Sequence, residues 1–341
     1  MIVATTDTEP GSEPETEDLT LVEAVNDGLH AVMDRDDDVL VLGEDVGKNG
    51  GVFRATDGLY ETFGERRVID TPLAESGIVG TAIGLAAGGF RPVAEIQFLG
   101  FAYPAFEQLV NHAARLRSRS RGRYACPMVV RTPYGGGIRS PEHHSESTEA
   151  FFVHYPGLKV VVPSTPADTK GLLAAAVRDP DPVVFLEPAR RYRSFREAVP
   201  TGEHAVDLGE AAIRREGADV SAFAWGAMVQ PTLDAAEYLA ETEGVECEVI
   251  DLRTLFPLDT ETVVESVRKT GRAAVVHEAP RTGGLAGEIV ATVQEEALLY
   301  LVAPIERVTG FDVPFPLYAT EEYYLPERAR IVDRLREVVA F

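Results

Sequence analysis

Cysteine is scarce in this 341-residue chain, and its scarcity excludes two kinds of site. The two cysteines, Cys126 and Cys247, are too few and too far apart for a disulfide framework or a zinc site. Long apolar runs are missing too, because no stretch approaches the roughly 18–20 uninterrupted apolar residues of a membrane-spanning helix. The opening segment, MIVATTDTEPGSEPETED, lacks the basic start and apolar core of a secretory signal. We expect a disordered acidic tail over 1–17 and a cytoplasmic protein.

Lysine is also rare, since only four of the 32 basic residues are lysine, at positions 48, 159, 170 and 269. Asp and Glu number 55, which gives a formal net charge of −23. An acidic surface of this kind repels nucleic acid and anionic membranes, so we expect neither as a partner. A lysine-poor acidic surface predicts a halophilic protein, because a Debye length of about 3 Å at 1 M salt screens self-repulsion. Ordinary solubility is the alternative explanation.

Hydrophobic periodicity predicts an α/β fold with two domains. Apolar residues at helical spacing over 21–33 precede the strand-like run VLVLGED. Four further strand-like runs alternate with helical stretches over 76–89, 104–117 and 166–178; the runs are RPVAEIQF, PMVVRTP, LKVVVPS and PVVFLEP. This alternation indicates a parallel sheet covered by helices on both faces. Periodicity fades before a second, shorter α/β series, so we expect domains over 18–195 and 207–341 with a linker over 196–206.

Common catalytic motifs are absent. The chain contains no G-x-S-x-G elbow, no H-E-x-x-H and no complete phosphate-binding loop. The stretch RTGGLAGEIV (281–290) follows a predicted strand but reads G-G-x-x-G rather than G-x-G-x-x-G. A corner where a helix packs closely on a sheet is one interpretation, and a nucleotide-binding turn is the other.

The segment RTPYGGGIRSPEHHSESTEAFF (131–152) places two imidazoles and two carboxylates after three glycines. The glycines allow the backbone to approach a ligand closely. Adjacent His143 and His144 are poorly placed to bind one metal ion, and no cysteine or third histidine lies nearby in the sequence. Proton transfer or anion stabilisation by one imidazole is the functional interpretation. A surface loop with a chance histidine pair is the alternative.

Glu75 stands at the start of an apolar, small-residue run, TPLAESGIVGTAIGLAAGG (71–89). A carboxylate near a helix N-terminus gains about 0.3–1 kcal/mol from the helix dipole, which is a purely structural explanation. The functional explanation is a carboxyl group whose pKa is raised by a desolvated setting, so that it shares a proton with a bound heterocycle. Spacing alone does not decide between them.

Several long blocks resemble one family, and they appear in its order from about residue 18 to the C-terminus. The blocks are VLVLGEDVG, RVIDTPLAESGIVGTAIGLAAGGFRPVAEIQF, PEHHSES, PGLKVVVPSTPADTKGLLAAAVRDPDPVVFLEP, CEVIDLRTLFPLD and HEAPRTGGLAGEI. They resemble the beta subunit of thiamine-diphosphate-dependent 2-oxo acid dehydrogenases, which act on pyruvate or branched-chain 2-oxo acids. The resemblance implies a transketolase-like fold, with a pyrimidine-binding domain and a smaller C-terminal domain. It also implies oxidative decarboxylation of a 2-oxo acid and acylation of lipoamide.

The resemblance assigns roles to single residues. Glu75 would hydrogen-bond the aminopyrimidine ring of thiamine diphosphate and favour the imino tautomer, whose nitrogen can remove the thiazolium proton. Phe101 would pack on that ring, and Leu73 and Gln97 would neighbour the cofactor. His144 would assist acyl transfer to lipoamide, whereas His143 stands where the family varies. Glu44 matches an acidic residue of a proton path between two active sites.

The resemblance also implies metals and partners. Backbone carbonyls near a loop would hold a structural potassium ion, from Cys126, Met128, Val129, Ala176, Val177, Asp179 and Asp181. In this enzyme class a Gly-Asp-Gly element and an Asn-Asn pair hold Mg²⁺ and the diphosphate. This chain contains no Gly-Asp-Gly, and its three asparagines are never adjacent. An alpha subunit would therefore supply that half of the site in an alpha-two beta-two heterotetramer. The C-terminal domain would dock the subunit-binding domain of a dihydrolipoyl acyltransferase core, whose lipoyl domain would receive the acyl group.

Two other functions compete with this one. The chain could be half of a split transketolase or deoxyxylulose-phosphate synthase, but PEHHSES does not look like the sugar-phosphate loops of those enzymes. It could be a non-catalytic subunit that binds a nucleotide at 281–290, which would leave Glu75 and the histidine pair unexplained. Within the dehydrogenases, RYRSFREAVP and RSPEHHSES resemble pyruvate-type subunits, whereas HEAPRTGG and FDVPFP resemble branched-chain types. The preferred 2-oxo acid stays open.

Overall fold

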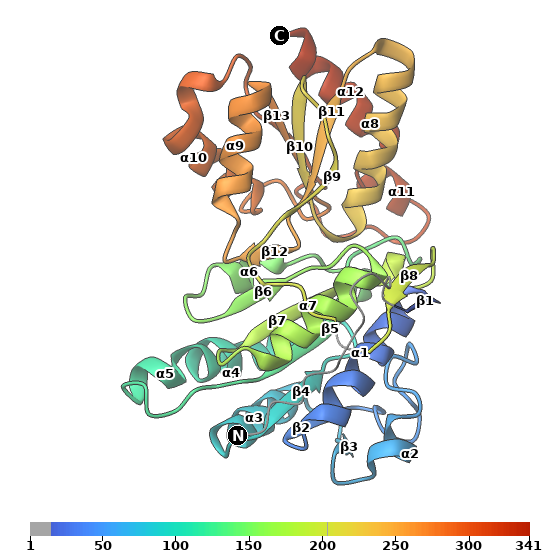
Figure 1. Cartoon of the computed structure of the whole chain (residues 1–341), viewed down its shortest axis with the longest axis vertical. Coiled ribbons are helices and arrows are strands. Elements are labelled where there is room, and N and C mark those ends of the chain that lie inside the picture. The colour runs from blue at the N-terminus through green and yellow to red at the C-terminus, as the bar shows by residue number, and fades with distance from the viewer. Residues whose placement is uncertain (1–14, 203) are drawn as a thin grey trace.

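Two separate sheets organise the chain into two stacked α/β units, as the computed structural model shows (Figure 1). The structure describes residues 15–202 and 204–341. In Figure 1 the first unit lies below in blue to green, and the second lies above in yellow to red. The predicted α/β class is confirmed.

The first sheet has seven strands in the order β12-β6-β7-β5-β4-β2-β3. Its strands are β2 (Val39–Gly43), β3 (Val68–Asp70), β4 (Arg91–Glu95), β5 (Val129–Tyr134), β6 (Lys159–Val161), β7 (Val183–Pro188) and β12 (Thr254–Phe256). All neighbouring strands are parallel except β12, which pairs antiparallel with β6 at the edge. The strand β12 belongs to the segment that the sequence assigns to the second domain, so the chain crosses back into the first sheet there.

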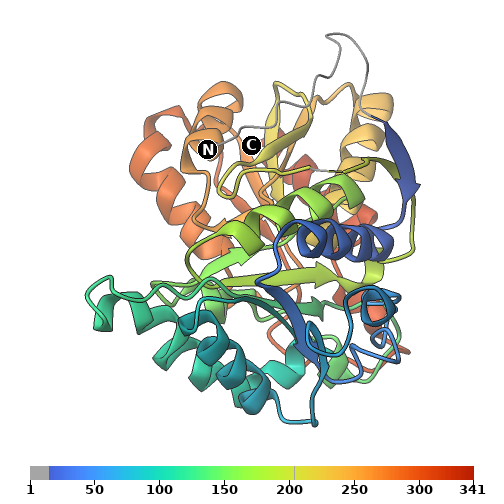
Figure 2. The same ribbon diagram turned by 60° about the horizontal axis from the view of Figure 1, so that its bottom comes forward.

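Helices cover both faces of the first sheet, as the periodicity predicts. Helices α1 (Leu21–Arg35) and α7 (Pro166–Arg178) pack on one face, where alternate strand residues such as Val39 and Val41 join their apolar cluster. Helices α3 (Glu75–Ala87) and α4 (Tyr103–Asn111) pack on the other face with Leu40 and Leu42. Figure 2 shows α1 and α7 side by side across the sheet. Alternate strand residues thus face opposite helical layers, as a sheet buried on both faces requires.

Shorter helices complete the first unit. They are α2 (Leu59–Phe63), η1 (Leu99–Ala102), η2 (Ala113–Arg115), α5 (Leu116–Arg119), η3 (Glu142–His144), α6 (Glu149–Val153) and η4 (Ala189–Arg191). The single helix predicted over 104–117 is wrong, because α4 stops at Asn111. The Val110 carbonyl beside the break accepts a 3.0 Å hydrogen bond from Arg115 Nε instead of continuing the helical ladder.

The second sheet has five strands in the order β14-β13-β10-β11-β9, of which β9 alone is antiparallel to its neighbour. The strands are β9 (Ala212–Arg215), β10 (Val220–Ala224), β11 (Cys247–Asp251), β13 (Ala273–Val276) and β14 (Glu306–Val308). The helices of this unit are η5 (Gly226–Met228), α8 (Val229–Glu243), α9 (Thr260–Thr270), α10 (Ala286–Ala297), η6 (Leu298–Tyr300), α11 (Glu321–Tyr324) and α12 (Arg328–Ala340). Helices α8 and α12 share one apolar cluster with the sheet, whereas α9 and α10 pack on the opposite face.

A small ribbon corrects the prediction for the chain start. Strand β1 (Thr16–Leu19) pairs antiparallel with β8 (Glu197–Pro200), so Thr16 and Glu17 are not part of a disordered tail. Arg196 secures the ribbon with hydrogen bonds of 2.8 Å to the Asp18 carbonyl and 2.7 Å to Glu23. The rest of the predicted tail, 1–14, lies outside the described residues.

One apolar cluster continues from the first unit into the second. It runs from α3 and α4 through Tyr134 and Val162 to Phe223, Trp225 and Ile250 of the second unit. The two units therefore share a buried core rather than touching only at their surfaces. Over residues 15–202 and 204–341, no helix is both long and apolar enough to cross a membrane.

Candidate active site

The predicted site residues of the first unit follow the carboxyl ends of neighbouring parallel strands. Glu44 follows β2, and the turn that leads to Glu75 follows β3. Gln97 and Phe101 follow β4, and the loop that carries His144 follows β5. The four strands are adjacent in the order β5-β4-β2-β3, and the connections change direction at β2. Crevices at such switch points are the usual ligand sites of parallel α/β sheets.

Glu75 is the first residue of α3, and its carboxylate lies at the helix N-terminus. Ala74 before it offers no side-chain cap, so the first amides of the helix are available to a ligand. Leu73 is 71% exposed at the same rim. Partial burial and the negative charges of Asp45 and Glu75 raise the pKa of Glu44. Glu44 and Glu75 are therefore within electrostatic reach of each other.

Phe101 and His144 come together in an aromatic group. The His144 ring lies edge-to-face with Phe98 at 4.5 Å and with Phe101 at 5.1 Å between centroids. The His143 ring lies 5.2 Å from Phe101 on the more exposed side. A Cβ at Gly100 would lie 2.1 Å from the His143 carbonyl oxygen, so only glycine lets the loop dock here.

His144 carries a polar atom that the described chain does not satisfy. Its Nδ1 is buried and finds no hydrogen-bond partner among the residues described. Buried polar atoms in native proteins are normally paired, so this one is suited to a bound ligand. Gln97 is half-buried and lies two residues beyond β4, the strand between β2 and β5. Sequence reasoning missed Phe98, which an apolar run gives no reason to single out.

A buried network of ion pairs connects β4, β5 and β7, the strands next to these ends. Arg131 of β5 is 1% exposed and donates to both carboxylate oxygens of Glu187, each at 2.7 Å. Arg131 also pairs with Glu95 of β4, and the Tyr192 hydroxyl donates to Glu187 at 2.5 Å. Burial raises the pKa of Glu95, although the Arg131 charge opposes the shift. Sequence reasoning missed this network, whose one signal is charged residues inside apolar strands.

The segments assigned to a potassium site do converge. Residues 126–129 and 176–181 lie side by side, joined by one backbone hydrogen bond of 3.2 Å from the Cys126 amide to the Pro180 carbonyl. Arg91 Nη1 donates to the Val177 carbonyl at 2.9 Å, and Lys159 pairs with Asp179, the residue that follows α7. The carbonyls of Cys126, Met128 and Ala176 also accept backbone hydrogen bonds, so the chain itself already engages part of the assigned set. Within the described chain, no cluster of three or more His, Cys, Asp or Glu could hold a metal.

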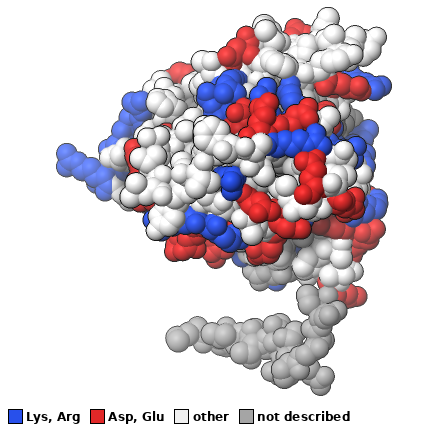
Figure 3. Space-filling view, turned by 90° about the horizontal axis from the view of Figure 1, so that it is seen from above, with Lys and Arg blue, Asp and Glu red and all other residues white. Residues whose placement is uncertain are grey.

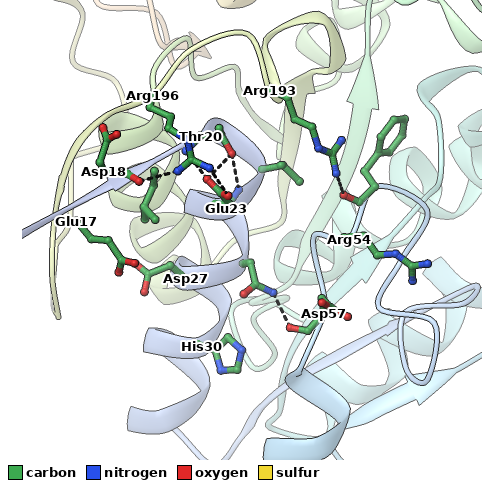
Figure 4. Close-up of a pocket in the computed structure, with 14 residues that line it drawn as sticks. Glu17, Asp18, Thr20, Glu23, Asp27, His30, Arg54, Asp57, Arg193 and Arg196 are labelled. Carbon is green, nitrogen blue, oxygen red and sulfur yellow. Dashed lines mark hydrogen bonds and ion pairs between the residues drawn. The ribbon is translucent and has the colours of Figure 1, made fainter.

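A polar cavity of about 800 Å³ lies elsewhere, between β1, the start of α1 and the loops near Phe53 and Arg193 (Figure 4). Two of its arginines are engaged by other lining residues. Arg196 pairs with Glu23, and Arg193 donates to the Phe53 carbonyl at 2.6 Å. None of the predicted site residues lines this cavity.

Within the glycine-rich stretch over 281–290, Gly284 lies at a packing corner. A Cβ at Gly284 would lie 2.7 Å from His277 Cε1, and the His277 ring stacks on Trp225 at 5.1 Å between centroids. Gly284 therefore lets α10 approach the end of β13, as the packing interpretation expects, although Gly283, Gly284 and Gly287 also line a cavity of about 740 Å³.

Comparison with known families defines the class of protein. Residues 17–194 match the transketolase pyrimidine-binding domain, and residues 209–331 match the transketolase C-terminal domain. A solved structure of a split-gene transketolase, an inactive beta4 tetramer, superposes with a TM-score of 0.77 at 24% identity. That alignment covers 95% of this chain and 99% of the other. The chain therefore has the transketolase-like fold that its motifs imply.

Closer relatives identify the family within that class. The pyruvate dehydrogenase E1 component subunit beta of Bacillus subtilis (strain 168) is 50% identical over 323 residues, which cover 95% of this chain and 99% of the relative. The subunit of the same name from Acholeplasma laidlawii is 49% identical over 320 residues, which cover 94% and 98%. The chain belongs to the family of beta subunits of thiamine-diphosphate-dependent 2-oxo acid dehydrogenases.

Proposed function

We propose that this chain decarboxylates pyruvate together with an alpha subunit and passes the acyl group to lipoamide. Both relatives described above are named pyruvate dehydrogenase subunits, which favours pyruvate over branched-chain 2-oxo acids. The observation that carries the proposal is the placement of Glu75 and His144 at the carboxyl ends of one sheet's parallel strands. These are the two residues to which the family resemblance gives chemical roles.

Thiamine diphosphate, when bound, supplies the carbon nucleophile and the electron sink for decarboxylation. The residues present fit this cofactor, because the strand ends offer a carboxyl group, an aromatic ring and an unpaired buried imidazole nitrogen. Glu75 would share a proton with a ring nitrogen of the aminopyrimidine, and Phe101 would pack on that ring. Leu73 and Gln97 would complete the pocket wall. Glu44, whose pKa is raised by partial burial and in part by the negative charge of Glu75, would relay protons.

His144 would act on the acyl group. Its ring is fixed by Phe98 and Phe101, so its unpaired nitrogen has a defined position from which to hold or donate a proton. The His143 ring contacts Phe101 from the more exposed side, and its role stays open.

An alpha subunit would bring the Mg²⁺ and diphosphate half of the site. The chain has no Gly-Asp-Gly element, and the outer face of α3 beside Glu75 is exposed and built from small residues. At Gly84, a Cβ would meet no described atom within 4 Å outside the local backbone. This small-residue face at the rim of the site leaves room for another chain, and the heterotetramer would supply one.

The second unit would dock the acyltransferase core. Figure 3 shows acidic and basic side chains intermingled on the outer face of this unit. Its ion pairs include Arg336 with Glu243 at 2.5 Å and Arg215 with Glu246 at 2.6 Å. Carboxylates without such a partner would meet arginines of the subunit-binding domain, and the terminal Phe341, 76% exposed, would add apolar contact.

The test is reconstitution of the chain with its alpha subunit, Mg²⁺ and thiamine diphosphate. Decarboxylation and lipoamide acylation are measured with pyruvate and, in parallel, with branched-chain 2-oxo acids. A higher kcat/KM for pyruvate is expected. A preference for branched-chain acids would overturn the substrate assignment, and no decarboxylation of either would overturn the function.

A further inference from the structure

The loop that carries His144 is held at its base by the second unit. Gly136, at the start of this loop, donates its amide to Glu278 Oε2 at 2.8 Å. Glu278 lies just after β13, 142 residues further along the chain. Three residues on, the Arg139 amide donates to Glu321 at 3.2 Å. Two carboxyl groups of the second unit therefore hold the backbone of one active-site loop of the first.

The second unit packs closely against Gly135 and Gly136, which form the stem of this loop. A Cβ at Gly135 would lie 2.6 Å from Glu278 Oε1, and Gly135 also has a φ of +86°. A Cβ at Gly136 would lie 2.2 Å from the Phe315 ring. Glycine is therefore required at 135 by its positive φ, and a side chain at 136 would have to displace the Phe315 ring of the second unit.

The stem is connected to the imidazole by a short, closed path. The Gly135 amide donates to the Glu146 carbonyl at 2.9 Å, which closes the loop at its base. At the tip, the His143 carbonyl rests on Gly100 and the His144 ring rests on Phe98. A shift of the stem must therefore move the tip or break its contact with η1.

Glu278 is 3% exposed and sits among several ionisable groups. Burial and the nearby charge of Glu149 raise the pKa of Glu278 to about 7, against the opposing effect of the Gly136 amide and Arg190. Glu321 also raises this pKa, and the Tyr134 and Tyr324 hydroxyls face the same region. Oε1 of Glu278 finds no hydrogen-bond partner within the described residues. The group is therefore a neutral acceptor at low pH and a poorly compensated buried charge at high pH.

We propose that Glu278 is a positioning residue for His144, and that its carboxyl group fixes the 135–148 loop from the second unit. The consequence for acyl transfer rests on the proposed function, but the anchoring of the loop does not. Glutamine at 278 keeps the acceptor oxygen and the shape without a titrating proton, so Glu278→Gln separates anchoring from charge. Glu322→Gln is the matched control, because Glu322 is exposed and pairs with the Arg139 side chain of the same loop.

Hydrogen–deuterium exchange of the chain tests the anchoring without any catalysis. For Glu278→Ala we expect exchange over 135–148 to speed up at least tenfold, with Glu278→Gln and Glu322→Gln near wild type at pH 6.5. As the pH rises from 4.5 through about 7, the wild-type loop should lose protection beyond the intrinsic pH effect, whereas Glu278→Gln should not. Unchanged protection in Glu278→Ala, or the same pH response in Glu278→Gln and wild type, would overturn the proposal.

The assembled tetramer tests the link to His144. Glu278→Ala should reduce lipoamide acylation more than decarboxylation, and combining it with His144→Ala should add less than twofold to the loss from His144→Ala alone. Full additivity of the two losses would contradict positioning through His144. If Glu278→Ala does not fold, the pH profile of Glu278→Gln decides. Failure of the tetramer to use any 2-oxo acid would overturn the proposed function and leave the exchange result standing.

Discussion

At the scale of single residues, Glu75 is a carboxylate at the mouth of an apolar helix with little structural purpose there. Within the described chain it makes no hydrogen bond or ion pair, and the helix has no side-chain cap. The dipole of α3 stabilises its charge by about 0.3–1 kcal/mol. A residue that contributes so little to the fold can be changed without harm to it.

Glu75→Gln should therefore leave folding and assembly intact and lower decarboxylation by about 10²–10⁴-fold, since the proton that Glu75 is proposed to share with the cofactor would be lost. Turnover of the reconstituted enzyme measures the effect. Glu61→Gln, in the first turn of α2 and exposed, is the control. Turnover near that of the wild type in Glu75→Gln would refute the role of this residue.

For Arg131 we predict a loss of stability, in contrast to Glu75, because its buried ion pairs join the strands that carry the site. Removing it leaves Glu95 and Glu187 buried without their cation, so Arg131→Met should lower the free energy of unfolding by about 3–5 kcal/mol. Arg334→Met, which breaks the exposed pair with Glu337, should cost at most about 1 kcal/mol. Denaturant unfolding measures both, and equal losses would contradict the buried network.

The sequence predicted some of these residues and missed others for a physical reason. Glu75 and His144 lie in motifs whose neighbours along the chain reveal them. Arg131 finds its partners 36 and 56 residues away, and Gly136 finds Glu278 142 residues away. Such pairs exist only once the strand order is set, which local patterns do not specify.

At the scale of elements, the long periodic helices were predictable and the short strands were not. Helix α7 has the predicted bounds, 166–178, because Thr165 caps it and its apolar spacing is regular. Strands β1, β8 and β12 have three or four residues and no clear alternation, so pairing with distant strands defines them.

The exposed face of α3 gives a prediction about assembly with the alpha subunit. Gly84→Arg should leave the isolated chain folded, because the chain itself leaves the space open, and should prevent assembly with the alpha subunit. Gly287→Arg in α10, another exposed helical glycine with open space among the described residues, is the control. Sedimentation of the mixed subunits measures assembly. A tetramer formed by Gly84→Arg as well as by Gly287→Arg would place the interface elsewhere.

At the scale of the whole molecule, the charge of −23 predicts a response to salt. Raising the salt to about 1 M shortens the Debye length to about 3 Å and should raise the unfolding temperature. If the loop at 126–129 and 176–181 holds potassium, KCl should stabilise the chain more than NaCl at equal ionic strength. Thermal unfolding in the two salts measures both effects. Equal midpoints in KCl and NaCl would contradict the ion, and no rise with salt would contradict halophily.

The two stacked units share one core, and each contributes to the same end of the first sheet. Under the proposed function this arrangement provides one half of an active site, with Glu75 and His144 at the strand ends and no Gly-Asp-Gly element for the metal and diphosphate. The central claim is therefore that the site becomes whole only across two chains.

Calorimetric titration of thiamine diphosphate with Mg²⁺ tests that claim most directly. We predict negligible binding to the isolated chain and saturable, Mg²⁺-dependent binding once the alpha subunit is added. Tight, Mg²⁺-dependent binding by the isolated chain would contradict the claim.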